Sequence, residues 1–348
     1  SARFSRPEPT ALQTNRRLHM PTDAPATARQ PSVLSILIRN PLAGVFVALV
    51  AIFVISALIS PYFLTAYNMS VIARGLAFVG LVTIAQASLM ILGELDLSLG
   101  TIGGLCGVVS GMLMVQAGLP WGVALVLALV LGMALGLLNG FLVTALGLHS
   151  LVLTIGTAGI YGGAILVLTK GVAITGIPEG IQFLGRGAVL GVPVPFIVML
   201  VVLAVALFLT TRTPMGRYMY AIGNNAAAAR MLGIRVDRIR LLVFTFAGML
   251  SALAGMLMVA RLGTAQPSIG QAWVLAPIAA SVIGGVATTG GVGSPLGAIF
   301  GAGIIAIIEN IIVLFGVSPY WQGVVSGAIV VLAISFDALS RRYLRRAT

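Results

Sequence analysis

Residues 121–146, WGVALVLALVLGMALGLLNGFLVTAL, contain no charged side chain from end to end. About 20 apolar residues in a helix cross a hydrocarbon core about 30 Å thick, so this stretch predicts a transmembrane helix. Similar stretches recur on both sides of it, and 59% of the 348 residues are hydrophobic while 8% are charged, with a mean hydropathy of +1.10. The sequence therefore predicts an all-α polytopic membrane protein with about ten transmembrane helices. The expected spans are 42–60, 69–92, 98–117, 121–146, 150–169, 193–211, 239–261, 273–289, 295–315 and 321–339.

The basic residues gather on one side of these spans. If the chain starts inside the cell, sixteen of them face the cytoplasm, whereas Lys170, Arg186 and Arg261 face outward and Arg74 lies in a span. This is a strong positive-inside signal, so we expect both termini in the cytoplasm and the chain in a bacterial inner membrane. The net charge of +12 then reflects topology and attraction to the lipid bilayer, and nucleic acid is not an expected partner.

This topology divides the chain into three regions. Residues 1–40 are polar, Pro-rich and basic, which predicts a mostly disordered cytoplasmic tail in which Met20 is a candidate natural start. Residues 41–340 form the transmembrane domain, with a long cytoplasmic segment at 212–240. Residues 341–348 are a basic cytoplasmic C-terminus.

The sequence offers no set of residues for catalysis or metal binding. Cys106 is the single cysteine, His19 lies in the tail, and His149 stands alone near a loop. No nucleophile with a base, and no cluster of metal ligands, is apparent. Residues 288–293 lack the Gly-Lys-Ser/Thr ending of a phosphate loop. We therefore expect no enzyme activity, no catalytic residue, no metal and no cofactor bound by this chain.

A polar break interrupts the apolar pattern at residues 93–100, GELDLSLG. Carboxylates are costly in a bilayer, and a broken helix is tolerated there only where protein or a water-filled path surrounds it. Glu94, Asp96 and Ser98 are therefore candidates for a substrate path. For Asp96 we favour a structural role as the N-cap of the next helix, whereas for Glu94 structure and solute binding stay equally open.

A second break lies at residues 284–295, where Ser294 and Pro295 predict the N-cap and first position of the next helix. The two breaks occupy corresponding places in the two halves of the chain, which hints at an internal repeat. Glu309 and Asn310 form a further polar pair inside a span. They too are candidates for the substrate path, although an ion pair or interhelical hydrogen bond is the favoured alternative.

Two segments outside the spans suggest contacts with partners. In the cytoplasmic segment, the alanine run 226–229 predicts a short helix capped by Asn225 and Gly233, of the kind that a partner can seat in a groove. The residues expected to contact that partner are Met215, Gly216, Arg217, Gly223, Asn224, Asn225, Ala226, Ala229, Arg230 and Gly233. On the outer side, residues 171–193 form a Gly- and Pro-rich connection that predicts a small cap, and Glu179, Arg186 and Arg261 are its candidate docking residues.

Several ordered motifs resemble the ribose-type ABC sugar permeases, the branch that also serves xylose, galactose-like sugars and autoinducer 2. The matching stretches are 63–68 (FLTAYN), 93–100 (GELDLSLG), 216–225 (GRYMYAIGNN), 228–230 (AAR), 233–234 (GI), 284–293 and 316–322 (GVSPYWQ). The resemblance covers nearly all of residues 41–339. One departure is Glu94, which stands where the family usually has glycine and adds a carboxylate near the expected path.

The resemblance implies a type II importer permease fold with broken helices. It also implies a second permease copy or paralogue, an ABC ATPase subunit that carries ATP and Mg, and a periplasmic solute-binding protein, with the cytoplasmic segment as the ATPase-coupling region. The expected cargo is therefore a small sugar that the binding protein delivers, and two alternatives stay open. The cargo can be a nucleoside or a branched-chain amino acid, and broken helices with buried carboxylates also suit an ion-driven secondary transporter.

Overall fold

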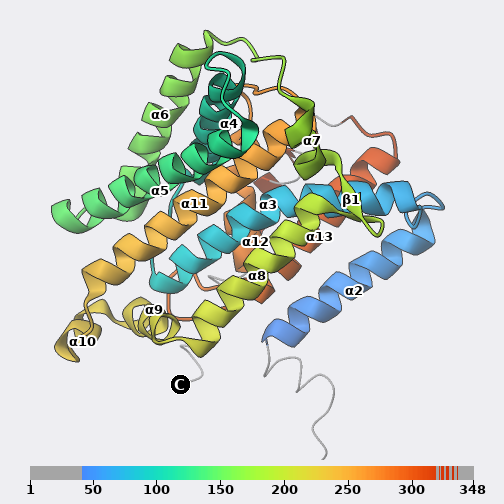
Figure 1. Ribbon diagram of the computed structural model, residues 1–348. Helices are drawn as coiled ribbons and strands as arrows, with labels where there is room; N and C mark the ends of the chain where they lie inside the picture. Colours follow the sequence, from blue (N-terminus) through green and yellow to red (C-terminus); the bar gives the residue numbers. More distant parts are fainter. Residues whose placement is uncertain are drawn as a thin grey trace, which may run out of the picture.

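The computed structural model describes residues 41–318 and, beyond them, residues 321, 323, 324, 327, 328, 331, 332 and 335. Most of the described chain is helical (Figure 1). The helices are α2 (Pro41–Ile59), α3 (Ala66–Leu92), α4 (Leu99–Val115), α5 (Trp121–Leu146), α6 (Ser150–Thr169), α7 (Glu179–Arg186), α8 (Val194–Arg212), α9 (Pro214–Asn224), α10 (Ala226–Met231), α11 (Val236–Leu262), the 3-10 turn η1 (Gln271–Trp273), α12 (Ala276–Ile283) and α13 (Pro295–Leu314). The expected tail 1–40, the C-terminus 341–348 and most of the span 321–339 lie outside the described residues.

Within the described residues, seven helices are long and apolar enough to cross a membrane, namely α2, α3, α5, α6, α8, α11 and α13. The expected all-α polytopic fold is confirmed, but the count of ten spans is not. Helix α4 has 17 residues and α12 has 8. The span expected at 273–289 is interrupted because the chain turns at Gly284 and Gly285, and Gly285 has a positive φ of 81°.

Helices α3 and α11 form the centre of the bundle. In an apolar stretch of 18 residues within each helix, 83% of the residues are buried in α3 and 67% in α11, against 6% in α2. Helix α11 packs closely on α5, where a side chain at Gly136 would overlap the carbonyl oxygen of Phe244. Small residues at helix crossings allow this close approach. Lipid tails are as apolar as the protein, so helices in a membrane associate through such close packing and not through burial of apolar surface.

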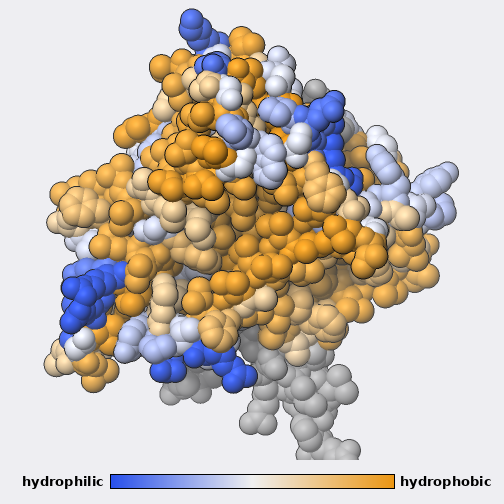
Figure 2. Space-filling model, viewed as in Figure 1, coloured by the Kyte–Doolittle hydropathy of each residue, from blue (hydrophilic) through white to orange (hydrophobic). Residues whose placement is uncertain are grey.

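The surface matches this arrangement. Figure 2 shows an apolar band across most of one face, with hydrophilic residues gathered toward its two ends. Helix α2 packs on α13 along one edge and exposes Phe46, Ile55 and Leu58. At one end of the band a hairpin of β1 (Ala188–Val189) and β2 (Val192–Pro193) follows α7, and Leu190 in its turn is 100% exposed. A broad apolar surface of this kind suits contact with lipid tails.

Candidate functional site: two helix breaks, a coupling segment and a cavity

The first break follows Gly93, which ends α3 with a φ of 87°. The backbone of residues 94–98 has left one helix and not yet entered the next, so its amide groups need other partners. Two hydroxyls of α6 supply them: the Leu95 amide donates to Ser150 Oγ at 3.1 Å, and the Leu97 amide donates to Thr154 Oγ1 at 3.1 Å. Helix α6 therefore stabilises the break from the side.

Asp96 lies at the centre of a buried polar network. Its Oδ1 accepts from the Ser98 amide at 2.7 Å and from Ser98 Oγ at 2.6 Å, and its Oδ2 accepts from Asn139 Nδ2 at 3.2 Å. Tyr161 in turn donates to Asn139 Oδ1 at 3.0 Å. The N-cap position predicted for Asp96 is wrong, although its side chain does hold the break through Ser98 and Asn139. Ser98 is the N-cap residue of α4 and makes no side-chain cap bond, because Asp96 binds Ser98 itself instead of the first helical turn.

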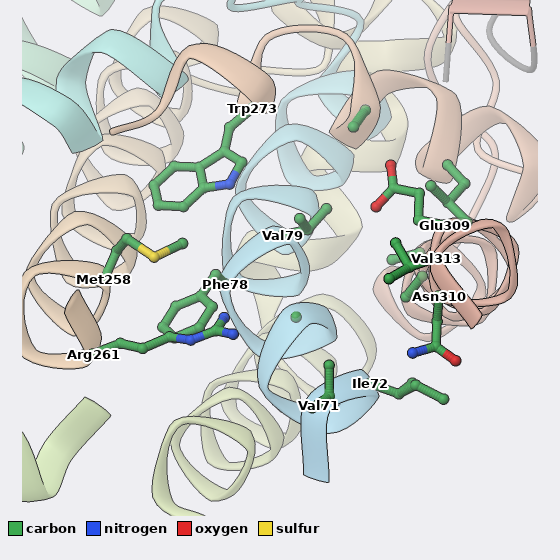
Figure 3. Close-up of a pocket in the computed structure, with 15 residues that line it drawn as sticks. Val71, Ile72, Phe78, Val79, Met258, Arg261, Trp273, Glu309, Asn310 and Val313 are labelled. Carbon is green, nitrogen blue, oxygen red and sulfur yellow. The ribbon is translucent and has the colours of Figure 1, made fainter. Parts of the chain in front are cut away.

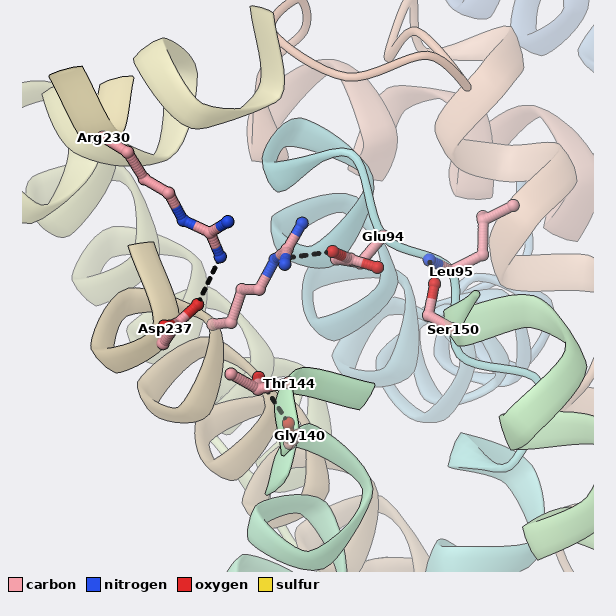
Figure 4. A network of polar contacts seen from close by, with 8 residues as sticks. Glu94, Leu95, Gly140, Thr144, Ser150, Arg230 and Asp237 are labelled. Carbon is pink, nitrogen blue, oxygen red and sulfur yellow. Dashed lines mark hydrogen bonds and ion pairs between the residues drawn. The ribbon is translucent and has the colours of Figure 1, made fainter. Parts of the chain in front are cut away.

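Glu94 forms an ion pair with Arg240, near the start of α11, with 2.8 Å between Oε1 and Nε. The two side chains are 8% and 23% exposed. A second pair, Arg230 with Asp237 at 2.7 Å, lies in the same corner of the molecule (Figure 4), but both of its side chains are 56% exposed. The sequence did not indicate Arg240 as a partner for Glu94.

The first break, the second break and α9 meet in one place, which we call the inner junction and define by Gly93, Gly223, Gly290 and Gly291. The Gly291 amide donates to the carbonyl oxygen of Ile91 at 2.9 Å. A side chain at Gly223, near the end of α9, would overlap that same oxygen and the Gly291 amide nitrogen. The end of α9 therefore contacts the backbone of both breaks directly.

Tyr220 strengthens this contact. Its hydroxyl donates to the carbonyl oxygen of Gly293 at 2.8 Å, which ties α9 to the loop before α13. Burial raises the pKa of Tyr220 above its ordinary value, because the phenolate would lose its water. The hydroxyl therefore stays protonated and remains a donor throughout the neutral pH range.

The segment 212–240 contains the helix that the alanine run predicts. Asn225 Oδ1 accepts from the Ala228 amide at 3.0 Å as the N-cap of α10, and Gly233 follows its end with a φ of 80°. Ala229 is buried against the bundle, whereas Met231 is 90% and Leu232 is 80% exposed. These two apolar side chains form a protruding tip that the sequence analysis did not include among the contact residues. The N-cap at Ser294, which accepts from the Leu296 amide, and Pro295 at the first position of α13 are also confirmed.

At the opposite end of the bundle, Arg186 links α7 to α11. Its guanidinium donates to the carbonyl oxygens of Arg261 at 2.6 Å and Leu262 at 2.9 Å, and Arg74 donates to the carbonyl oxygen of Arg186 at 2.9 Å. The structure therefore brings together Arg186 and Arg261 from the expected docking set. Glu179 is exposed at the other end of α7.

A cavity of about 390 Å³ lies between α3, α11, α12 and α13. Gly75 and Val79 of α3 line it, with Phe78, Trp273 and Arg261 on one side and Glu309 and Asn310 on the other (Figure 3). The guanidinium of Arg261 lies 5.3 Å from the centre of the Phe78 ring, a cation–π distance. Trp273 and Gly75 were not indicated by any sequence pattern.

The five candidates for the substrate path do not share one site. Glu309 and Asn310 line the cavity, whereas Glu94, Asp96 and Ser98 belong to the first break and are absent from its lining. Asn310 exchanges two hydrogen bonds with Asn68 of α3, at 3.1 and 2.8 Å. The interhelical hydrogen bond favoured for this pair is therefore confirmed for Asn310.

Comparison with known proteins gives concordant matches. Residues 79–334 match the family model described as the branched-chain amino acid transport system permease component. The ribose import permease protein of Bacillus subtilis is 39% identical over 297 residues, which cover 84% of this chain and 92% of that protein. The autoinducer 2 import system permease protein of an Enterobacter species is 32% identical over 310 residues, covering 89% and 90%. The ribose import permease protein of Haemophilus influenzae is 34% identical over 296 residues, covering 84% and 91%. No solved structure matches significantly.

Proposed function

The chain belongs to the ribose-type family of ABC importer permeases, and on that premise we propose that it carries a small sugar across a bacterial inner membrane. It is a multi-pass transport subunit and not an enzyme. The main support for a sugar as cargo is similarity, over more than four-fifths of the chain, to permeases named for ribose and autoinducer 2. The family description names branched-chain amino acids, which keeps that cargo as the second candidate. The ion-driven transporter is set aside, because relatives of this kind work within ATP-driven importers.

We further propose that α9 and α10 form the coupling region on which a separate ABC ATPase acts. The exposed tip of Met231 and Leu232 supports this, because apolar side chains on a short helix fit a groove on a partner. The inner junction supports it as well, since a displacement of α9 would press directly on both helix breaks. ATP and Mg are assigned to the ATPase.

Three further assignments complete the proposal. The end of the bundle with α7, Arg186 and Arg261 faces the periplasm and receives the loaded solute-binding protein. Both termini and the coupling region face the cytoplasm, in line with the positive-inside signal. A second permease copy or paralogue completes the membrane unit. ATP binding then shifts the pair between outward- and inward-open states by differential affinity, and this chain performs no covalent chemistry.

The test is co-purification of the tagged chain with the ATPase encoded by the same organism, followed by import of D-ribose into vesicles. We expect Leu232→Asp to abolish the association, because a carboxylate cannot replace the leucine in an apolar groove. Leu190→Asp is the matched control, since this leucine is also highly exposed, lies in the hairpin after α7 and should leave the association intact. Import of D-ribose on an ion gradient without an ATPase would refute the proposal.

A further inference from the structure

The cavity between α3, α11, α12 and α13 is closed at one end and open at the other. Phe78 and Trp273 are 1% and 5% exposed, whereas Val313 is 45% exposed and Val71 is partly exposed. Val71 lies near the start of α3, the end that the proposed topology places on the periplasmic side. The cavity therefore opens toward the side from which a solute would arrive and is sealed toward the inner junction.

The lining of the cavity suits an uncharged ring with hydroxyl groups. Trp273 offers an apolar aromatic surface, and the other walls are mostly aliphatic. Arg261 supplies donors and Glu309 supplies acceptors, and because their charges are opposite the lining has no net charge to attract an ion. Ligand pockets commonly measure about 300–1,000 Å³, and the cavity falls within that range. Asn310 is held by Asn68 and serves as part of the wall.

We propose that this cavity holds the solute during import, and that it selects a neutral polyhydroxyl ring by stacking on Trp273 between Arg261 and Glu309. The inference rests on the proposed import function and deepens it by naming the place and the chemistry of recognition. It differs from the sequence-based expectation, because it assigns the solute to the cavity and leaves Asp96 and Ser98 to the stabilisation of the first break.

Gly75 provides a probe of this space. A side chain added there meets no atom within 4 Å, so Gly75→Cys should place a thiol in the cavity without disturbing the packing of α3. The native thiol, Cys106, is buried, and Cys106→Ala removes it from the background. Gly122, near the start of α5, also has open space around it, does not line the cavity and lies on the proposed outer side. Gly122→Cys is thus the matched control.

The experiment labels both cysteine variants with a membrane-impermeant maleimide in cells that carry the whole importer. We expect both to react, and we expect excess D-ribose to slow labelling at Gly75→Cys but not at Gly122→Cys. Trp273→Phe should preserve the protection, whereas Trp273→Leu should raise the D-ribose concentration needed for it by about tenfold, which corresponds to the loss of one aromatic contact.

In the labelling experiment, the inference is overturned by no reaction at Gly75→Cys while Gly122→Cys reacts, by no protection from D-ribose or other monosaccharides, or by unchanged protection in Trp273→Leu. Protection by L-leucine in place of D-ribose would overturn the polyhydroxyl class. A separate readout distinguishes failure of the proposed function. If the ATPase does not co-purify, the proposed import function is wrong. If Gly75→Leu keeps the ATPase and imports D-ribose as well as Gly75→Ala does, only the inference about the cavity is wrong.

Discussion

At the scale of single residues, burial distinguishes two ion pairs that are chemically alike. Glu94 and Arg240 have lost most of their contact with water, whereas Arg230 and Asp237 are each 56% exposed. Removing one member of a buried pair leaves the other charge without compensation, while an exposed charge is solvated and screened. Because the two pairs occupy the same corner (Figure 4), they allow the effect of burial to be measured with similar groups.

We predict that Glu94→Gln lowers the free energy of unfolding by roughly 1–3 kcal/mol, because Arg240 then keeps its charge in a site with little water. Asp237→Asn, the control, should cost about 0.2–1 kcal/mol. Denaturant unfolding in mild detergent measures both. The double variant Glu94→Gln with Arg240→Gln should recover part of the loss. Equal losses of unfolding free energy in Glu94→Gln and Asp237→Asn would show that burial does not increase the contribution of the Glu94–Arg240 pair to stability.

The residue types at the first break were readable from the sequence, but their partners were not. Two carboxylates and a serine between glycines indicated a break in the helix at residues 93–100. The groups that complete it, such as Asn139 and Thr154, lie on helices whose order in space no local pattern gives. The caps at Asn225 and Ser294 bind amides two or three residues away, and both were predicted correctly. The N-cap predicted at Asp96 was wrong, because Ser98 takes that position.

At the scale of elements, the inner junction places the end of α9 in direct contact with the two breaks. Gly223 lies against the Ile91 carbonyl and the Gly291 amide, so the backbones of α3, α9 and the loop before α13 meet without side chains between them. Side chains can adjust their rotamers and absorb a displacement, but packed backbones cannot. We therefore infer that a movement of α9 would be passed on to both breaks.

We predict that Gly223→Ala keeps the ATPase bound but lowers D-ribose import by about 2- to 30-fold, the range expected when a coupling contact loses about 0.5–2 kcal/mol. The added methyl group must separate α9 from α3, while Met231 and Leu232 remain exposed for docking. Co-purification and vesicle import measure the two effects. Gly163→Ala in α6, where the methyl group meets open space, is the control. Unchanged import in Gly223→Ala would mean that the junction does not transmit motion.

The elements themselves were predicted unevenly, for a physical reason. Long apolar stretches such as α5 and α6 have the bounds that were expected, because lipid contact imposes an uninterrupted apolar run on them. Helix α12 is buried by its neighbours instead, so hydropathy carries no information about where it ends. The cavity was missed for the same reason, since Trp273 and Gly75 line one space only through the tertiary packing of the helices.

At the scale of the whole molecule, the charges and the apolar band together support the proposed orientation. The band in Figure 2 separates the end with α9 and α10 from the end with α7 and the hairpin. The first of these ends is basic, with Arg217 in α9 and Arg230 in α10. A polytopic protein keeps its short basic connections in the cytoplasm. The proposed roles depend on this orientation, because the coupling tip must meet an ATPase inside the cell and the open end of the cavity must meet solute outside.

We predict that Leu190→Cys reacts with a membrane-impermeant maleimide in intact spheroplasts, whereas Leu232→Cys reacts only after the membrane is permeabilised. Both leucines are highly exposed, at 100% and 80%, so accessibility in the folded protein does not favour either one. Permeabilised spheroplasts of both variants supply the control for intrinsic reactivity, and Cys106→Ala removes the native thiol. Labelling of Leu232→Cys in intact spheroplasts would show that the topology is the reverse of the one proposed. The assignment of α9 and α10 to the ATPase, and of the cavity mouth to the periplasm, would then be wrong.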